Sequence, residues 1–210
     1  MNNFARKIGR GFESQKGFSL IEMLVAMAIF VLFTGVLLTS YLGIVKALRN
    51  AEDYRILYSE ARHVFDVITD TARNYRIDYY DNYRGAKSFT NPVTNLEFLS
   101  LDGLKKIRFA FNEGVADGAS SFVMSEFTRD SADVEFGSEN VVSLYSDEIT
   151  IKDFDFYVWP LEDPFSYGKF EITNNFQPKV TFSAVFEKEA SSGQEYKMNL
   201  QTSVSLRNYN

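Results

Sequence analysis

Cysteine is absent from this chain, and histidine occurs once, at position 63. Without cysteine there is no disulfide framework, no cysteine–zinc site and no thiol catalysis. With no second histidine and no cysteine, no metal or triad constellation can be assembled around His63, which we interpret as an inert surface residue. The sequence also shows no nucleophile–base signature and no glycine-rich phosphate loop. We therefore expect that the protein is not an enzyme.

Proline is also scarce, with four in the chain, and the first of them is Pro92. Charge is missing from Met23 to Val45, a run of 23 residues, and Lys46 and Arg49 follow it. A helix of this length spans about 35 Å, which is enough to cross the hydrocarbon core of a membrane. The run is too long for a secretory signal peptide and lacks a small-residue cleavage site at its far end.

The charges are unevenly distributed between the first residues and the rest of the chain. Residues 1–17 carry a net charge of +3 and the whole chain −6, so residues 18–210 carry −9. A basic segment before an apolar run predicts a single-pass protein of the cytoplasmic (inner) membrane, with residues 1–17 inside and the bulk outside. An acidic body repels phosphate backbones, so no specific nucleic acid is predicted as a partner.

The segment before the apolar run reads Lys-Gly-Phe-Ser-Leu-Ile-Glu-Met-Leu from residue 16 to residue 24. It resembles the cleavage motif of type IV prepilins and type II secretion pseudopilins, with Gly17, Phe18 and Glu22 at the motif positions. The resemblance implies cleavage between Gly17 and Phe18 by a prepilin peptidase and N-methylation of Phe18. It also implies bacterial filament partners, namely other pilin or pseudopilin subunits, an inner-membrane assembly platform and membrane lipid.

Glu22 supports this interpretation on physical grounds. An ionised carboxylate inside a membrane helix costs about 2.5–3.5 kcal/mol or more unless it finds a partner. Cleavage after Gly17 would create such a partner, the free amine of Phe18, about 6 Å away along a helix axis. A neighbouring subunit displaced by that distance would place its carboxylate level with this amine. We therefore predict an assembly charge pair between Glu22 and the Phe18 amine, while the alternative is that Glu22 reaches the headgroups and has no role.

The first helix departs from the pattern of many pilins, which carry a proline there. Gly35 and Gly43 could loosen the helix instead. Beyond Val45 an apolar stripe continues at alternating spacings of three and four, which predicts an amphipathic helix over residues 46–80. The stripe consists of Ala51, Tyr54, Tyr58, Ala61, Phe65, Ile68, Ala72, Tyr75 and Tyr79.

A loop over residues 81–95 is followed by strand patterns, so we expect an α+β, pilin-like fold with an antiparallel sheet packed on the helix. The expected strands are Leu96–Leu101, Leu104–Phe111, Phe122–Phe127, Val141–Tyr145, Ile149–Trp159, Val180–Phe186 and Tyr196–Leu206. Asp102-Gly103 is a two-residue hairpin signal. The predicted parts are thus a leader (1–17), a membrane or filament-core helix (18–45), an amphipathic helix (46–80) and a β-rich extracytoplasmic head (81–210).

Three functions remain open from the sequence. The first is a structural subunit, a minor pilin or pseudopilin, and a long head without cysteine is similar to minor pseudopilin J. Glu22 argues against the extreme tip subunit, pseudopilin K, which lacks that residue. The others are a tip module that binds DNA, a surface or an exported substrate, and a plain membrane-anchored domain in the periplasm or at the cell surface. No cofactor is expected, although oxygen ligands for calcium occur at Asp78, Asp81 and Asn82, at Asp130 and Asp133, and at Asp153 and Asp155.

Overall fold

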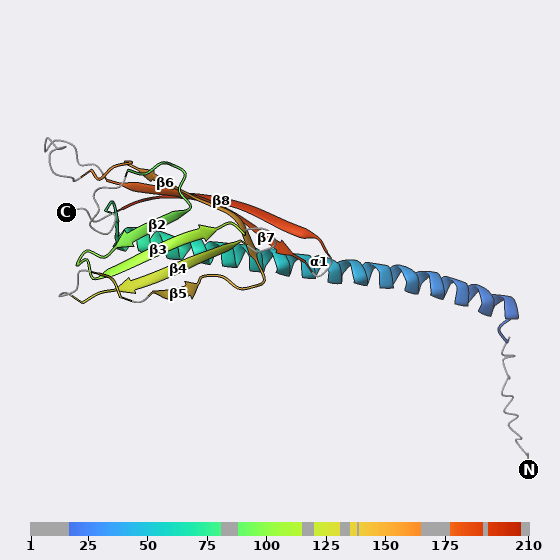
Figure 1. The fold of residues 1–210 in the computed structure, drawn as a ribbon. Helices are drawn as coiled ribbons and strands as arrows, with labels where there is room; N and C mark the ends of the chain where they lie inside the picture. Colours follow the sequence, from blue (N-terminus) through green and yellow to red (C-terminus); the bar gives the residue numbers. More distant parts are fainter. Residues whose placement is uncertain are drawn as a thin grey trace, which may run out of the picture. The chain divides into compact units, whose positions relative to one another are not determined.

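The computed structural model describes residues 17–80, 88–114, 120–130, 135–137, 139–164, 177–190 and 193–206. It divides into two compact units, Met1–Arg49 and Asn50–Asn210. Within these described ranges, one helix, α1 (Leu20–Asn74), is followed by eight strands. The strands are β1 (Arg76–Ile77), β2 (Asn95–Leu99), β3 (Lys105–Asn112), β4 (Ser121–Thr128), β5 (Asn140–Ser143), β6 (Thr150–Trp159), β7 (Lys179–Glu189) and β8 (Glu195–Ser205). The predicted α+β layout is confirmed (Figure 1).

The first part of α1 is apolar and exposed. No residue of its most apolar stretch is buried, and large side chains such as Leu32, Phe33 and Val36 are more than 60% exposed. Two polar side chains in this stretch bond their own helix, because Thr39 Oγ1 donates to the Gly35 carbonyl and Ser40 Oγ to the Val36 carbonyl, both at 2.9 Å. Gly35 and Gly43 both lie in continuous helix. Loosening of the helix at these two glycines stays a prediction.

The second part of α1 packs against the sheets, but its buried face differs from the predicted stripe. The buried residues are Leu57, Ala61, Val64, Phe65, Ile68, Thr71 and Ala72. Tyr54 and Tyr58 belong to the stripe, yet they are 50% and 47% exposed, and Leu57 is buried instead. The stripe coincides with the buried face from Ala61 to Ala72, and its members before Ala61 are exposed.

Helix α1 ends at Asn74, whereas the amphipathic pattern predicts helix up to residue 80. The difference comes from pairing with β2, a strand about twenty residues further along the chain. Arg76 and Ile77 pair with Leu99 and Phe98, and the Asp78 N–H donates to the Glu97 carbonyl at 2.9 Å. Sheet hydrogen bonds thus replace helical ones, and the short strand β1 was not predicted from the sequence.

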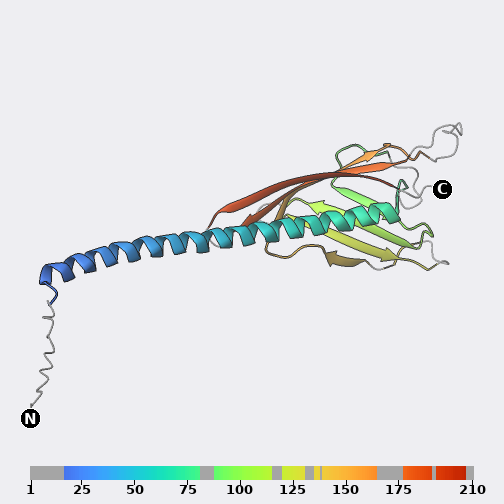
Figure 2. The same ribbon diagram turned by 180° about the vertical axis from the view of Figure 1, so that it is seen from behind.

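All seven predicted strands are present, within a few residues of their expected ends, but they form two sheets and not one. The first sheet has the order β1-β2-β3-β4-β5 and the second β6-β7-β8, with antiparallel pairing throughout. The chain leaves the first sheet after Ser143, and β6 pairs with β7 instead of β5. Figure 2 shows the later turns of α1 crossing strands of both sheets.

Two hairpin turns carry glycines with positive φ. Gly103, at +71°, lies in the connection between β2 and β3, where the Ser100 N–H donates to the Lys105 carbonyl at 2.8 Å. This bond closes a four-residue loop, 101–104, and not the predicted two-residue turn. Gly193, at +74°, lies in the β7–β8 connection.

Phenylalanine is the most frequent of the buried hydrophobic residues in the described part of the head. Phe122 from β4 stacks on Phe154 from β6 with ring centroids 4.2 Å apart, which joins the two sheets. Phe65 from α1 lies 4.8 Å from Phe182 of β7, which joins the helix to the second sheet. Each fully buried phenylalanine contributes about 1.5–3 kcal/mol through removal of apolar surface from water. The aromatic rings thus hold the helix and both sheets together.

Replacing Phe65 with alanine is expected to destabilise the head by about 3–5 kcal/mol, because the cavity would lie between three phenylalanine rings. The matched control is Tyr58→Ala on the exposed side of the same helix, where the expected loss is below about 0.5 kcal/mol. Denaturant unfolding of the full chain in detergent, followed by the fluorescence of Trp159, measures both. Equal losses for the two variants would contradict the buried face described here.

Candidate functional site

Two polar side chains cap the N-terminus of α1. The Ser19 N–H donates to Glu22 Oε2 at 2.9 Å, and the Glu22 N–H donates to Ser19 Oγ at 3.3 Å. This reciprocal pair is a capping box, which satisfies two backbone donors that have no helical acceptor. Ser19 is not among the predicted site residues, although Ser-x-x-Glu before an apolar run is the sequence signal for this arrangement.

Gly17 and Phe18 precede the helix in an open position. Both are exposed and outside regular structure, and the Phe18 side chain is 83% exposed. A Cβ built on Gly17 would have no neighbouring atom within 4 Å. The peptide bond between them is therefore sterically accessible in the residues that the structure describes. Residues 1–16 of the predicted leader lie outside the described residues.

The Glu22 carboxylate is held next to the predicted amine position. Its Oε2 accepts from the Ser19 nitrogen, which is the backbone nitrogen directly after that of Phe18. An amine created at Phe18 would thus lie close to this carboxylate in the same chain. The charge pair across subunits stays a prediction.

The helix that follows is long and apolar enough to cross a membrane, judged by length and composition. Its apolar side chains are exposed, and the described charge nearest the start of this stretch is that of Glu22. This is consistent with a membrane anchor, and it places the capping box at one end of the apolar segment.

The candidate oxygen ligands for calcium do not form a cluster of three acidic side chains in the described residues. Among these residues no group of three or more His, Cys, Asp or Glu side chains could hold a metal ion. Asp78 is buried and pairs with Lys106 at 3.2 Å, and Asp130 is exposed. Partial burial, together with the charge of Asp153, raises the pKa of Asp155. Asp81, Asn82 and Asp133 lie outside the described residues.

Two buried lysines form ion pairs that the sequence analysis did not predict. The Lys106 ammonium lies 3.2 Å from Asp78 and 3.6 Å from Glu97, and Glu97 also accepts from Arg108 at 2.8 Å. No sequence pattern signals this cluster, because its members come from segments far apart in the chain. His63, in contrast, is an exposed residue off the buried face of α1, in line with its predicted surface position.

The second lysine connects α1 to the three-stranded sheet. Lys188 on β7 lies 2.8 Å from Glu148 and 3.9 Å from Asp53 of α1, with 7% of its side chain exposed. Nearby on the same helix, Glu60 accepts from the Ser146 N–H at 3.2 Å. Charged groups of α1 therefore contact both the loop before β6 and strand β7. These polar contacts hold the helix against the head together with the packing of its apolar face.

Comparison with known protein families finds one match. Residues 14–38 match the family described as the prokaryotic N-terminal methylation motif, and this range includes Gly17, Phe18, Ser19 and Glu22. No curated protein and no solved structure matches the chain. The motif match and the long apolar helix together support a type IV pilin-like protein with a membrane anchor.

Proposed function

We propose that the chain is a structural subunit, a minor pilin or pseudopilin, of a type IV pilus-like or type II secretion filament. The observation that carries the proposal is the motif from Gly17 to Glu22 directly before an apolar helix whose side chains are exposed. Exposed apolar surface of this extent requires cover. Lipid provides it before assembly, and the helices of other subunits provide it in a filament.

Maturation has two parts in this proposal. A prepilin peptidase cuts between Gly17 and Phe18 and methylates the Phe18 amine. The basic leader keeps residues 1–17 in the cytoplasm, so the head lies outside the inner membrane. The proposed partners are this peptidase, other pilin or pseudopilin subunits, the assembly platform and lipid.

The head supports a minor subunit similar to pseudopilin J. Its described residues form eight strands in two sheets, and the chain has no cysteine to cross-link them. The capping-box glutamate, Glu22, favours a position within the filament over the extreme tip. We propose no enzymatic role, because the sequence holds no nucleophile–base signature.

Photo-cross-linking tests assembly directly. Leu32, which is 71% exposed, is replaced by photoreactive benzoylphenylalanine in cells that express the filament system. We expect adducts with other subunits that carry a prepilin motif, identified by mass spectrometry, and we expect them to disappear in the uncut Gly17→Val chain. The comparison is a chain that carries benzoylphenylalanine in place of Ser203, on the exposed face of β8. If chains that have been cut after Gly17 form adducts from position 32 only with lipid, the filament role is refuted.

A further inference from the structure

A pocket of about 550 Å³ lies in the head, on the outer face of the paired strands β2 and β3. Its floor consists of alternate residues of these strands, which point away from the buried side of the sheet. The floor residues are Asn95, Glu97, Arg108, Ala110 and Asn112. The volume lies within the range of about 300–1,000 Å³ that is usual for small-molecule sites. This hollow has no part in the cleavage motif or in the apolar helix.

The segment before β2 forms a wall of this pocket, and it is fastened to the other sheet. The Val93 N–H donates to the Phe156 carbonyl at 2.9 Å, and the Phe156 N–H donates to the Val93 carbonyl at 2.8 Å. The Asn91 side chain donates to the Val158 carbonyl at 2.8 Å and accepts from the Val158 N–H at 2.9 Å. The wall is thus in place before any ligand arrives, which lowers the entropy cost of binding.

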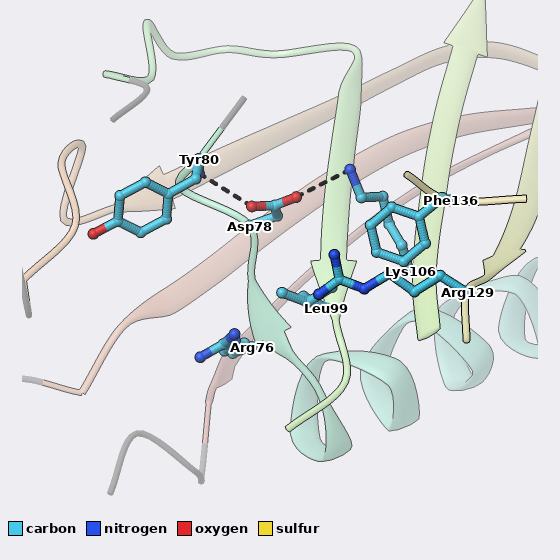
Figure 3. A pocket seen from close by; sticks show the side chains of 7 residues that line it. All are labelled: Arg76, Asp78, Tyr80, Leu99, Lys106, Arg129 and Phe136. Carbon is cyan, nitrogen blue, oxygen red and sulfur yellow. Dashed lines mark hydrogen bonds and ion pairs between the residues drawn. The ribbon is translucent and has the colours of Figure 1, made fainter. Parts of the chain in front are cut away.

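The charged groups of the floor are joined in a chain of ion pairs. Glu97 accepts from Arg108 at 2.8 Å and lies 3.6 Å from Lys106, which pairs with Asp78 at 3.2 Å. Asp78 lines this pocket and also a smaller one, and Figure 3 marks its contacts with Lys106 and the Tyr80 N–H. Two carboxylates thus meet two cations, so the floor favours neither an anion nor a cation as its ligand.

The rest of the lining combines neutral polar groups with apolar surface. Four side chains are polar and uncharged, namely Ser88, Thr90, Asn95 and Asn112. Each of these hydroxyl and amide groups can both donate and accept hydrogen bonds. Apolar surface between them comes from Phe89, Val93 and Ala110. A ligand would therefore meet hydrogen-bonding groups of both kinds beside small apolar areas.

We propose that this pocket binds a neutral sugar of one or two rings. Sugar hydroxyls donate and accept hydrogen bonds, as the hydroxyls and amides of the lining do, and the C–H faces of a sugar ring suit the apolar areas. A charged ligand would have to compete with the existing ion pairs of the floor. A free sugar and the end of a polysaccharide chain share this chemistry.

The test uses the full chain in micelles of lauryldimethylamine oxide, a detergent without a sugar, with ¹⁵N-labelled asparagine side chains observed by NMR. Cellobiose and maltose are the probes. We expect saturable shifts at Asn95 and Asn112 with a Kd on the order of 1 mM for at least one of them. Asn199, exposed on β8 and outside the pocket, is the internal control and should not shift.

Simpler and longer sugars define the ligand further. Glucose should bind at least about fivefold more tightly than glucuronate and glucosamine, its anionic and cationic counterparts, because the floor offers no net charge. Cellohexaose and maltohexaose distinguish the two sources. Tighter binding of a hexamer than of its dimer identifies a polysaccharide chain, equal binding identifies a free sugar or a chain end, and both results support the proposal.

Three variants complete the experiment. Thr90 is exposed, so Thr90→Val is expected to fold and to weaken binding about fivefold through the loss of one hydroxyl. Thr128→Val, exposed at the end of β4 and outside the pocket, is the matched control and should leave the Kd unchanged. Ala110→Leu places a larger side chain on the floor and should weaken binding at least about tenfold by steric exclusion.

Several results would overturn the proposal. These are tighter binding of glucuronate or glucosamine than of glucose, an unchanged Kd in both Thr90→Val and Ala110→Leu, and shifts at Asn199 as large as those at Asn112. The absence of shifts with about 20 mM disaccharide would overturn it as well. The readout is independent of cleavage and assembly, so it stands apart from the proposed filament role.

Discussion

Replacing Gly17 with valine is expected to leave the precursor uncut in the membrane. A peptidase must hold an extended backbone closely at the bond it cleaves, and glycine permits this because it has no Cβ. Misplacement of the reacting atoms by about 1 Å can reduce a rate about 100-fold, so a branched side chain at this position should abolish detectable cleavage. Co-expression with a prepilin peptidase, followed by N-terminal sequencing and intact-mass measurement, reports the outcome.

The structure makes this a test of recognition and not of folding. A Cβ at Gly17 would contact no atom within 4 Å, so valine should not disturb the described residues of the precursor. Gly11→Val, a leader glycine away from the junction, is the matched control and should be cut normally. In the wild-type chain the product should begin at Phe18 and carry the mass of one added methyl group. A wild-type chain that keeps its leader would contradict the proposed maturation.

Replacing Glu22 with glutamine is expected to reduce incorporation into filaments at least tenfold while cleavage continues. The structure suggests glutamine for this test, because a glutamine oxygen can still accept from the Ser19 N–H and keep the capping box. The substitution then removes the charge and little else. In an apolar filament core the attraction between carboxylate and amine is weakly screened, and a loss of 1.4 kcal/mol already corresponds to a factor of ten. Immunoblots of sheared filaments, normalised to the cut protein in the membrane, measure incorporation.

Ser19→Ala is the complementary variant. It removes the hydroxyl that accepts from the Glu22 N–H and should cost about 1 kcal/mol at the helix start, but it keeps the carboxylate. We expect near-normal incorporation of the cut Ser19→Ala chain. Normal incorporation of Glu22→Gln would remove the charge-pair hypothesis. A defect in Ser19→Ala as large as that in Glu22→Gln would assign the effect to the cap.

The candidate site was only partly predictable from the sequence. Gly17, Phe18 and Glu22 are found by a contiguous motif, and residues 14–38 match a family by the same local signal. Ser19 carries a signal too, since Ser-x-x-Glu marks a capping box, but its role depends on where the helix begins. The ion pairs of Lys106 with Asp78 and Glu97 have no sequence signal, because these residues meet only when β2 and β3 pair and the segment after β1 lies beside them.

By itself, the sequence determined the order and type of the elements: an apolar helix, its amphipathic continuation and seven of the eight strands in the part of the chain that the structure describes. These follow from local periodicity, which depends on near neighbours in the chain. Only the tertiary structure decided that α1 ends at Asn74, that Leu57 and not Tyr58 faces the core, and that the strands divide into two sheets. It also decided that Lys106 is buried between Asp78 and Glu97. Each of these depends on contacts between distant segments, and the energy of such contacts outweighs local preference where the two differ.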